Sequence, residues 1–199
     1  MRYGYMIIGL ALAFSLTLGA GVGQAHITPP VTLVSERDAV LSMTGGAKKF
    51  FVREVRLTPE EREAMQRQWG WRPEDERYRF YLGRDEAGQL VAAVIFLTDF
   101  TIHGPVRVAV GLGPDGRVRG AQVVELTEET YAWLKPLIDQ EFTKDYIGRD
   151  SRANFGVSER VMRMRLESMP QFYAHTVASL IQRAAVLFDV AVLKRDGKI

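Results

Sequence analysis

The sequence predicts an α+β fold, in which an antiparallel sheet of two hairpins is flanked by N-terminal helices and a long C-terminal helix. Three observations support this. The middle of the chain holds four segments rich in β-branched and aromatic residues, separated by turns that contain glycine. Helix-start signals lie on both sides of these segments. The last part of the chain is an apolar stretch of helical length. Strands and helices that occupy separate parts of a chain are typical of α+β proteins.

Residues 1–25 are predicted to be a signal peptide. Arg2 supplies a positive start, residues 6–18 are almost entirely apolar, and Gly23 and Ala25 are the small residues that signal peptidase accepts. A run of this length is shorter than the roughly 20 residues that span a bilayer. Cleavage is therefore favoured over an uncleaved membrane anchor, which stays open if the following glycine-rich stretch also inserts. We expect a periplasmic or otherwise extracytoplasmic protein.

Residues 26–75 are predicted to form an N-terminal helical segment after an extended entry. Ser35 can cap a first helix. Thr58 is followed three positions later by Glu61, which is the spacing of a capping box and predicts a second helix. Between the two helices, residues 48–55 fit either a strand or a short helix.

Residues 76–199 are predicted to form the α+β domain itself. Its two hairpins are expected from strands at residues 78–82 and 90–97, and from strands at residues 106–112 and 118–126. The second hairpin has Gly-Pro-Asp-Gly at residues 113–116, which suits a tight turn.

Three helical segments follow the strands. Thr127 or Thr130 can cap the first, which should run through residue 142, end at residues 146–148, and be kinked or split at Pro136. Residues 157–167 are expected to form a short, arginine-rich helix, and residues 168–193 a long one. The long helix carries polar residues that argue for packing against the sheet rather than for crossing a membrane, namely Gln182, Arg183 and Asp189.

The composition excludes several classes of site. The formal net charge is +2, and no Lys/Arg run is large enough to suggest a nucleic-acid partner. The chain has no cysteine, which excludes Cys-ligated zinc, iron–sulfur clusters, c-type haem and a thiol nucleophile. Its three histidines, His26, His103 and His175, are scattered and have no metal-ligand spacing. The sequence therefore offers no candidate catalytic or metal-binding residues.

Three features of the second half of the chain occur in the same order in a known family. They are His103-Gly104-Pro105 with the hairpin that follows, the pair Glu129-Thr130 just after that hairpin, and the long C-terminal helix. Residues 99–193 thereby resemble the FMN-binding domain of the flavin-carrying periplasmic subunits of Rnf and Na⁺-translocating NADH:quinone reductase complexes, and of nitrous oxide reductase accessory proteins. The resemblance implies a site for FMN.

The chain departs from this family at the flavin-attachment motif. Covalent members have Ser-Gly-Ala-Thr at the start of the last helix, and a flavin transferase esterifies the threonine to the FMN phosphate. The matching residues here are Tyr173-Ala174-His175-Thr176, with Ser179 downstream. Small residues let a phosphate approach the N–H groups of a helix start. Tyr173 and His175 place bulk there, so FMN could be covalent at Thr176, non-covalent or absent.

Each residue implied by the resemblance also has a structural interpretation. His103-Gly104-Pro105 could lie along a flavin or simply begin a strand. Glu129-Thr130 could contact flavin or belong to a helix cap. Thr176 could anchor FMN or donate to its own helix, and His175 could adjoin the cofactor or be a half-buried helix residue. The candidate cofactor-binding residues are His103, Gly104, Pro105, Glu129, Thr130, His175, Thr176 and Ser179.

Two functions follow as hypotheses. The first is an exported FMN-binding protein that takes part in periplasmic electron transfer, in which the flavin supplies the redox chemistry. It would be an electron carrier rather than a stand-alone enzyme. The alternative is a flavin-free binding or assembly module for a membrane or periplasmic redox complex. The expected partner is a periplasmic or membrane redox protein, together with a flavin transferase if FMN is covalent.

Overall fold

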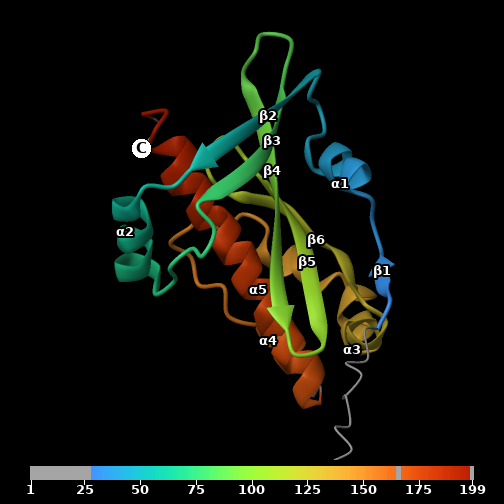
Figure 1. Ribbon diagram of the computed structural model, residues 1–199. Helices are drawn as coiled ribbons and strands as arrows, with labels where there is room; N and C mark the ends of the chain where they lie inside the picture. The colour runs from blue at the N-terminus through green and yellow to red at the C-terminus, as the bar shows by residue number, and fades with distance from the viewer. Residues whose placement is uncertain (1–27, 165–166, 198–199) are drawn as a thin grey trace, which may run out of the picture.

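The computed structural model describes residues 28–164 and 167–197 (Figure 1). The strands are β1 (Pro30–Thr32), β2 (Lys49–Arg56), β3 (Arg77–Arg84), β4 (Leu90–Thr101), β5 (Gly104–Leu112) and β6 (Val118–Thr127). The helices are α1 (Glu36–Met43), α2 (Pro59–Trp69), α3 (Glu128–Ile138), the 3-10 helix η1 (Phe142–Tyr146), α4 (Glu159–Met162), α5 (Ser168–Phe188) and the π-helical η2 (Asp189–Leu193). The predicted signal peptide, residues 1–25, lies outside the described residues.

The six strands form one antiparallel sheet in the order β1-β6-β5-β4-β3-β2. From β2 to β6 each strand pairs with the next one along the chain, so that β2 is one edge of the sheet. The first strand, β1, pairs with β6 and forms the other edge. Both predicted hairpins are present, as β3–β4 and β5–β6, and a tight turn from Thr101 to Gly104 joins them into a meander. The predicted α+β class is confirmed, with six strands where the sequence indicated four.

The two additional strands come from residues 26–75 and form the two edges of the sheet. Residues 48–55, for which a strand or a short helix was open, lie in β2, which pairs with β3 from Lys49 opposite Arg84 to Arg56 opposite Arg77. At the other edge the short strand β1 places Pro30 opposite Thr127. The N-terminal segment thus supplies both edge strands as well as α1 and α2.

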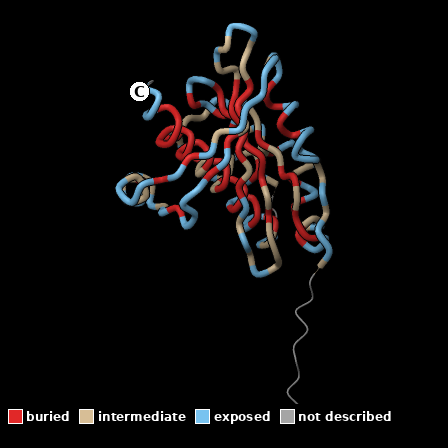
Figure 2. Tube along the Cα trace, turned by 45° about the horizontal axis from the view of Figure 1, so that its top comes forward, coloured by how far each residue is buried: buried red, intermediate tan, exposed pale blue. Residues whose placement is uncertain are grey.

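The sheet is covered on both faces, and successive side chains of a strand point to opposite faces. In β4, Ile95 belongs to the large core under α5, whereas Val94 belongs to a small cluster under α1. The α1 cluster consists of Ala39, Val40, Met43, Val94, Ala109 and Val124. Figure 2 shows buried residues gathered along the central strands and α5, with exposed residues at the loops and α2.

Helix α5 with η2 is the main element on the large-core face. The stretch Ser168–Leu193 is long and apolar enough to cross a membrane, but 83% of its most apolar window is buried inside the fold. Its polar residues have partners there: Asp189 is buried and accepts a hydrogen bond from Ser151 Oγ at 2.7 Å. The helix packs against the sheet, as its polar residues predicted.

The other helices differ from the prediction mainly in where they end. Thr127, not Thr130, caps α3, and its side chain accepts a hydrogen bond from the Thr130 N–H. The helix contains Pro136 and ends two residues later at Ile138, so the segment predicted to end at residues 146–148 is split between α3 and η1. A proline lacks an N–H and crowds the preceding turn, which explains the early end. Within residues 157–164, only one turn, α4, is helical.

Candidate functional site

The turn between β4 and β5 brings His103 and Gly104 into contact with the start of α3. Thr101 Oγ1 donates to the Gly104 carbonyl at 2.8 Å and accepts from the His103 N–H at 3.2 Å. Gly104 has a φ of +104°, and a Cβ at this position would lie 2.4 Å from Thr127 Cγ2. Both the backbone conformation and the close packing require glycine here. His103-Gly104-Pro105 therefore begins a strand, which was one of its two interpretations.

Glu129 and Thr130 lie in the first turn of α3, beside this hairpin turn. Thr127 Oγ1 donates to the His103 carbonyl at 2.9 Å and lies 2.8 Å from Thr130 Oγ1. Since the only hydroxyl hydrogen of Thr127 is used on His103, Thr130 donates to Thr127. Thr130 is fully buried. The Glu129 carboxylate is half exposed and lies 3.4 Å from His103 Nδ1. The pair thus serves the helix cap and also faces His103.

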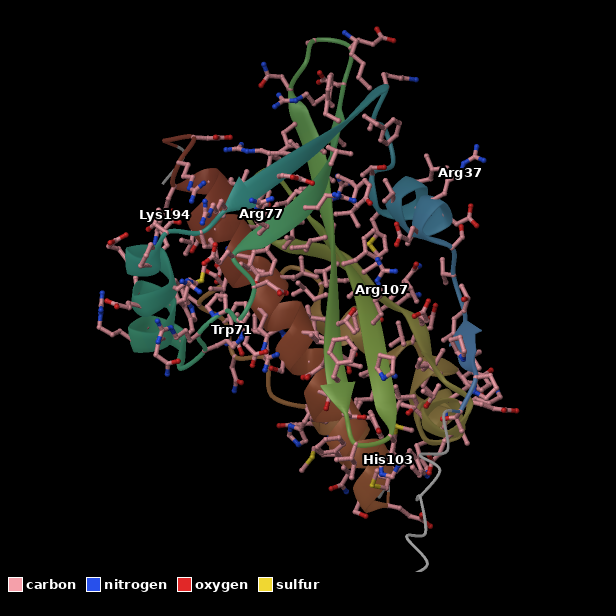
Figure 3. All side chains as sticks on the ribbon, viewed as in Figure 1. Arg37, Trp71, Arg77, His103, Arg107 and Lys194 are labelled. Carbon is pink, nitrogen blue, oxygen red and sulfur yellow. The ribbon has the colours of Figure 1, made fainter. Side chains whose placement is uncertain are left out.

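Four aromatic side chains meet at this place, and we call them the aromatic corner: His103, Trp133, Phe172 and Tyr173. The His103 ring meets Trp133 edge-on at 4.8 Å, and Trp133 stacks on Tyr173 at 5.7 Å. Phe172 meets the Tyr173 ring edge-on at 5.1 Å. The Tyr173 hydroxyl lies 3.0 Å from Thr101 Oγ1 and is the donor, because Thr101 uses its own hydrogen on Gly104. Figure 3 shows His103 at the end of the hairpin, close to the start of α5.

The remaining candidate residues lie further along α5. Thr176 is the ninth residue of the helix, is only 9% exposed, and donates from Oγ1 to the Phe172 carbonyl at 3.1 Å. His175 is exposed and Ser179 is half-buried. The structure therefore joins His103, Gly104, Glu129 and Thr130 in one network.

The position of Thr176 does not fit an FMN phosphate ester. The first four N–H groups of a helix are the ones free to bind an anion, and α5 begins at Ser168, two turns before Thr176. The Thr176 hydroxyl is already donated within its own helix. One turn earlier, the fully buried Tyr173 ring occupies the position that the resembling family gives to a small serine.

A second feature is an open groove of about 930 Å³ between β3 and β4, which we call the β4 groove. Its lining combines apolar and aromatic side chains with a larger number of charged ones. The apolar and aromatic ones come from the α2–β3 loop, β3, β4 and α5 and include Trp71, Tyr78, Phe96, Leu97, Phe100 and Leu180. In Figure 3, Trp71 lies between α2 and the lower half of β4. The groove was not predicted from the sequence, because it depends on where two strands separate.

Several charged side chains at the β4 groove are engaged with neighbours. Arg183 lies 3.6 Å from Asp99 and its guanidinium stands 5.4 Å from the Trp71 ring. Arg107 pairs with Glu36 at 2.5 Å. Burial, with a smaller contribution from Asp75, raises the pKa of the Tyr78 hydroxyl further above neutrality, so Tyr78 stays protonated at physiological pH. These groups suit binding rather than proton transfer.

Neither place presents a metal site among the residues that the structure describes, since no group of three or more His, Asp or Glu side chains is placed so that it could hold a metal ion. Comparisons with known proteins found no match to any family model, curated protein or solved structure. The resemblance to the FMN-binding domain therefore rests on the quoted residues alone, and the function has to be argued from the geometry.

Proposed function

We infer that this protein is a flavin-free binding module, the alternative that the altered attachment motif left open. The observation that carries this proposal is the packing of Tyr173. Its ring is fully buried, stacks on Trp133, and donates its hydroxyl to Thr101 on the β4–β5 hairpin. A side chain fixed on three sides by the fold leaves no room for a phosphate at the position where the resemblance would place one.

The state of Thr176 supports the same conclusion. Its hydroxyl would have to leave the Phe172 carbonyl and emerge from a site that is nine-tenths buried before it could be esterified. Without flavin, nothing among the residues that the structure describes is arranged to store an electron, and the polar side chains described above serve a helix cap, a turn and ion pairs. Recognition of another molecule is the role that remains for such a scaffold.

The test uses the full chain, purified from cells that also produce a flavin transferase. We expect a colourless protein without an FMN adduct by intact mass, and no quenching of FMN fluorescence when free FMN is titrated with it. A yellow protein that carries the mass of FMN, and loses it in Thr176→Ala, would overturn the proposal. Yellow protein of unmodified mass would also overturn it, because that result means non-covalent FMN.

A matched pair of variants shows which residues block the flavin. Tyr173→Ser with His175→Ala restores the small side chains of the resembling motif, whereas His175→Ala alone leaves the Tyr173 ring in place. If Tyr173 is the obstacle, any gain of FMN appears only in the double variant. Incorporation in the His175→Ala variant would show that Tyr173 does not exclude flavin.

A further inference from the structure

The sheet divides between β3 and β4. Their ladder ends where Phe80 lies opposite Ile95, but β4 continues and remains paired with β5 as far as Thr101 opposite Gly104. Figure 1 shows β2 and β3 turning toward α2 while β4 and β5 run on to the other end of the molecule. Residues 96–101 therefore have a ladder partner on one side only within the described chain. The β4 groove lies along this open side.

Pro105 determines which backbone groups point into the groove. Proline has no N–H, so the pair Phe100–Pro105 must be of the kind that exchanges no hydrogen bonds. Hydrogen-bonded and non-hydrogen-bonded pairs alternate along an antiparallel ladder. Phe96, Thr98 and Phe100 therefore turn their N–H and C=O groups away from β5. These groups face the open side, in the spacing that another β-strand would match.

The side chains around the groove suit a strand with two different faces. On the α5 side, Tyr78, Leu97 and Leu180 are buried apolar or aromatic residues that line the groove. On the opposite side, the Arg107 guanidinium stands 4.9 Å from the Phe96 ring. At the far end of the groove, Phe100 is 82% exposed, an unusual exposure for a large apolar side chain in a strand.

We propose that the β4 groove binds an extended segment of a partner protein, which adds as a strand to residues 96–101 of β4. The segment would have no proline at the positions that pair with β4. At every second position it would carry an apolar side chain that faces Tyr78 and Leu180 on the α5 side. This inference rests on the proposed function as a binding module and names its site. Only a peptide backbone offers donors and acceptors at strand spacing, which is why a polypeptide fits better than a small molecule or a lipid.

The site can be tested without knowing the natural partner. The probe is a random-peptide phage library selected against the full chain, and selected peptides are then synthesised. Thr98→Pro removes the N–H that faces the groove. Thr98 lies opposite Arg107 of β5 in a pair that exchanges no hydrogen bonds, so the fold should tolerate the loss of this N–H. Thr98→Val is the matched control because it keeps the N–H. We expect selected peptides to bind Thr98→Pro at least about tenfold more weakly than Thr98→Val, the effect of roughly one backbone hydrogen bond.

Amide hydrogen exchange supplies an independent reading of the same site. Bound peptide should slow exchange at the amides of Phe96, Thr98 and Phe100, while a peptide N-methylated at alternate positions should not bind. Thermal unfolding of both variants checks that each is folded. The inference is overturned if the library yields no binder, or if the binders do not distinguish the two Thr98 variants.

The outcomes separate this inference from the proposed function. If the protein binds neither FMN nor a peptide, the flavin-free assignment is supported and the proposed peptide site in the β4 groove is overturned. If the protein carries FMN, the flavin-free assignment is overturned whether or not peptides bind, because the flavin measurement does not involve Thr98.

Discussion

The aromatic corner lies around the turn that joins β4 to β5, and the β4 groove lies along β4 itself, yet the two places differ in whether their hydrogen-bonding groups have partners within the fold. At the corner, Tyr173 donates its hydroxyl to Thr101, Thr127 donates to the His103 carbonyl, and the rings pack on one another. At the groove, residues 96–101 of β4 have no pairing with β3, and the Phe100 side chain is exposed to solvent. The corner is therefore expected to govern stability, and the groove to govern binding. The following predictions test this division.

The largest effect is expected from Tyr173→Ala at the corner. Removing a fully buried aromatic side chain leaves a cavity, and the free energy of unfolding should fall by about 3–5 kcal/mol. Urea unfolding followed by circular dichroism measures this. Phe172→Ala is the control, because Phe172 is the sequence neighbour but is half exposed, and it should cost about 1 kcal/mol. Equal losses would show that the corner is not a packed core.

Gly104→Ala should have the next largest effect. The new Cβ would meet Thr127 Cγ2 and the backbone has a positive φ, so we expect a loss of about 2–4 kcal/mol in unfolding free energy. Gly88→Ala has a similar φ of +81° but nothing within 4 Å of the added Cβ, and isolates the backbone cost of about 1–2 kcal/mol. A difference near zero between the two variants would mean that the hairpin moves freely relative to α3.

A smaller effect is expected from the hydrogen bond between β4 and α5. Tyr173→Phe removes its donor and Thr101→Val its acceptor, and Tyr173→Phe alone should cost about 0.5–1.5 kcal/mol. A double-mutant cycle on unfolding free energies should give a coupling of similar size. If the two losses of unfolding free energy simply add, the Tyr173 and Thr101 hydroxyls do not interact, which would contradict the hydrogen bond between them.

The smallest effect on stability is expected in the groove. Phe100→Ser removes an exposed side chain, so the unfolding free energy should change by no more than about 0.5 kcal/mol. Its affinity for library-selected peptides should nevertheless fall, which isothermal calorimetry measures. A strongly destabilised variant would show that the Phe100 side chain contributes to the stability of the fold. Unchanged peptide affinity would show that Phe100 is not part of the binding surface.

Local signals predicted the helix starts correctly. Thr58 and Glu61 form the capping box that their spacing indicated, and Ser35 caps α1, because each cap depends on residues within one turn. The edge strands were harder. In β2 only Val55 is buried, so no alternation marks the strand, and β1 is three residues long. Alternation of apolar and polar residues arises where one face of a strand is buried, and most side chains of β2 are exposed on both faces.

The candidate site was predictable only in part. The cap interpretation of Glu129 and Thr130 follows from sequence, since Thr127 is three positions before Thr130. The stacking of Trp133 on Tyr173 does not follow, because it requires α3 and α5 to meet across many residues. The groove depends on the place where the β3–β4 ladder ends, which is a long-range feature that no short motif records.

The position of α5 after all six strands has a consequence for how the protein folds during synthesis. A chain is synthesised from its N-terminus, so the sheet strands emerge before the helix that packs on their large-core face. Until residues 168–193 arrive, that face lacks its main cover, and the apolar side chains that pack under α5 are open to aggregation or to a chaperone. Completion of the native state therefore waits for a helix that is synthesised after every strand of the sheet. Proteins cut short before this helix should be cleared rather than accumulate as soluble fragments.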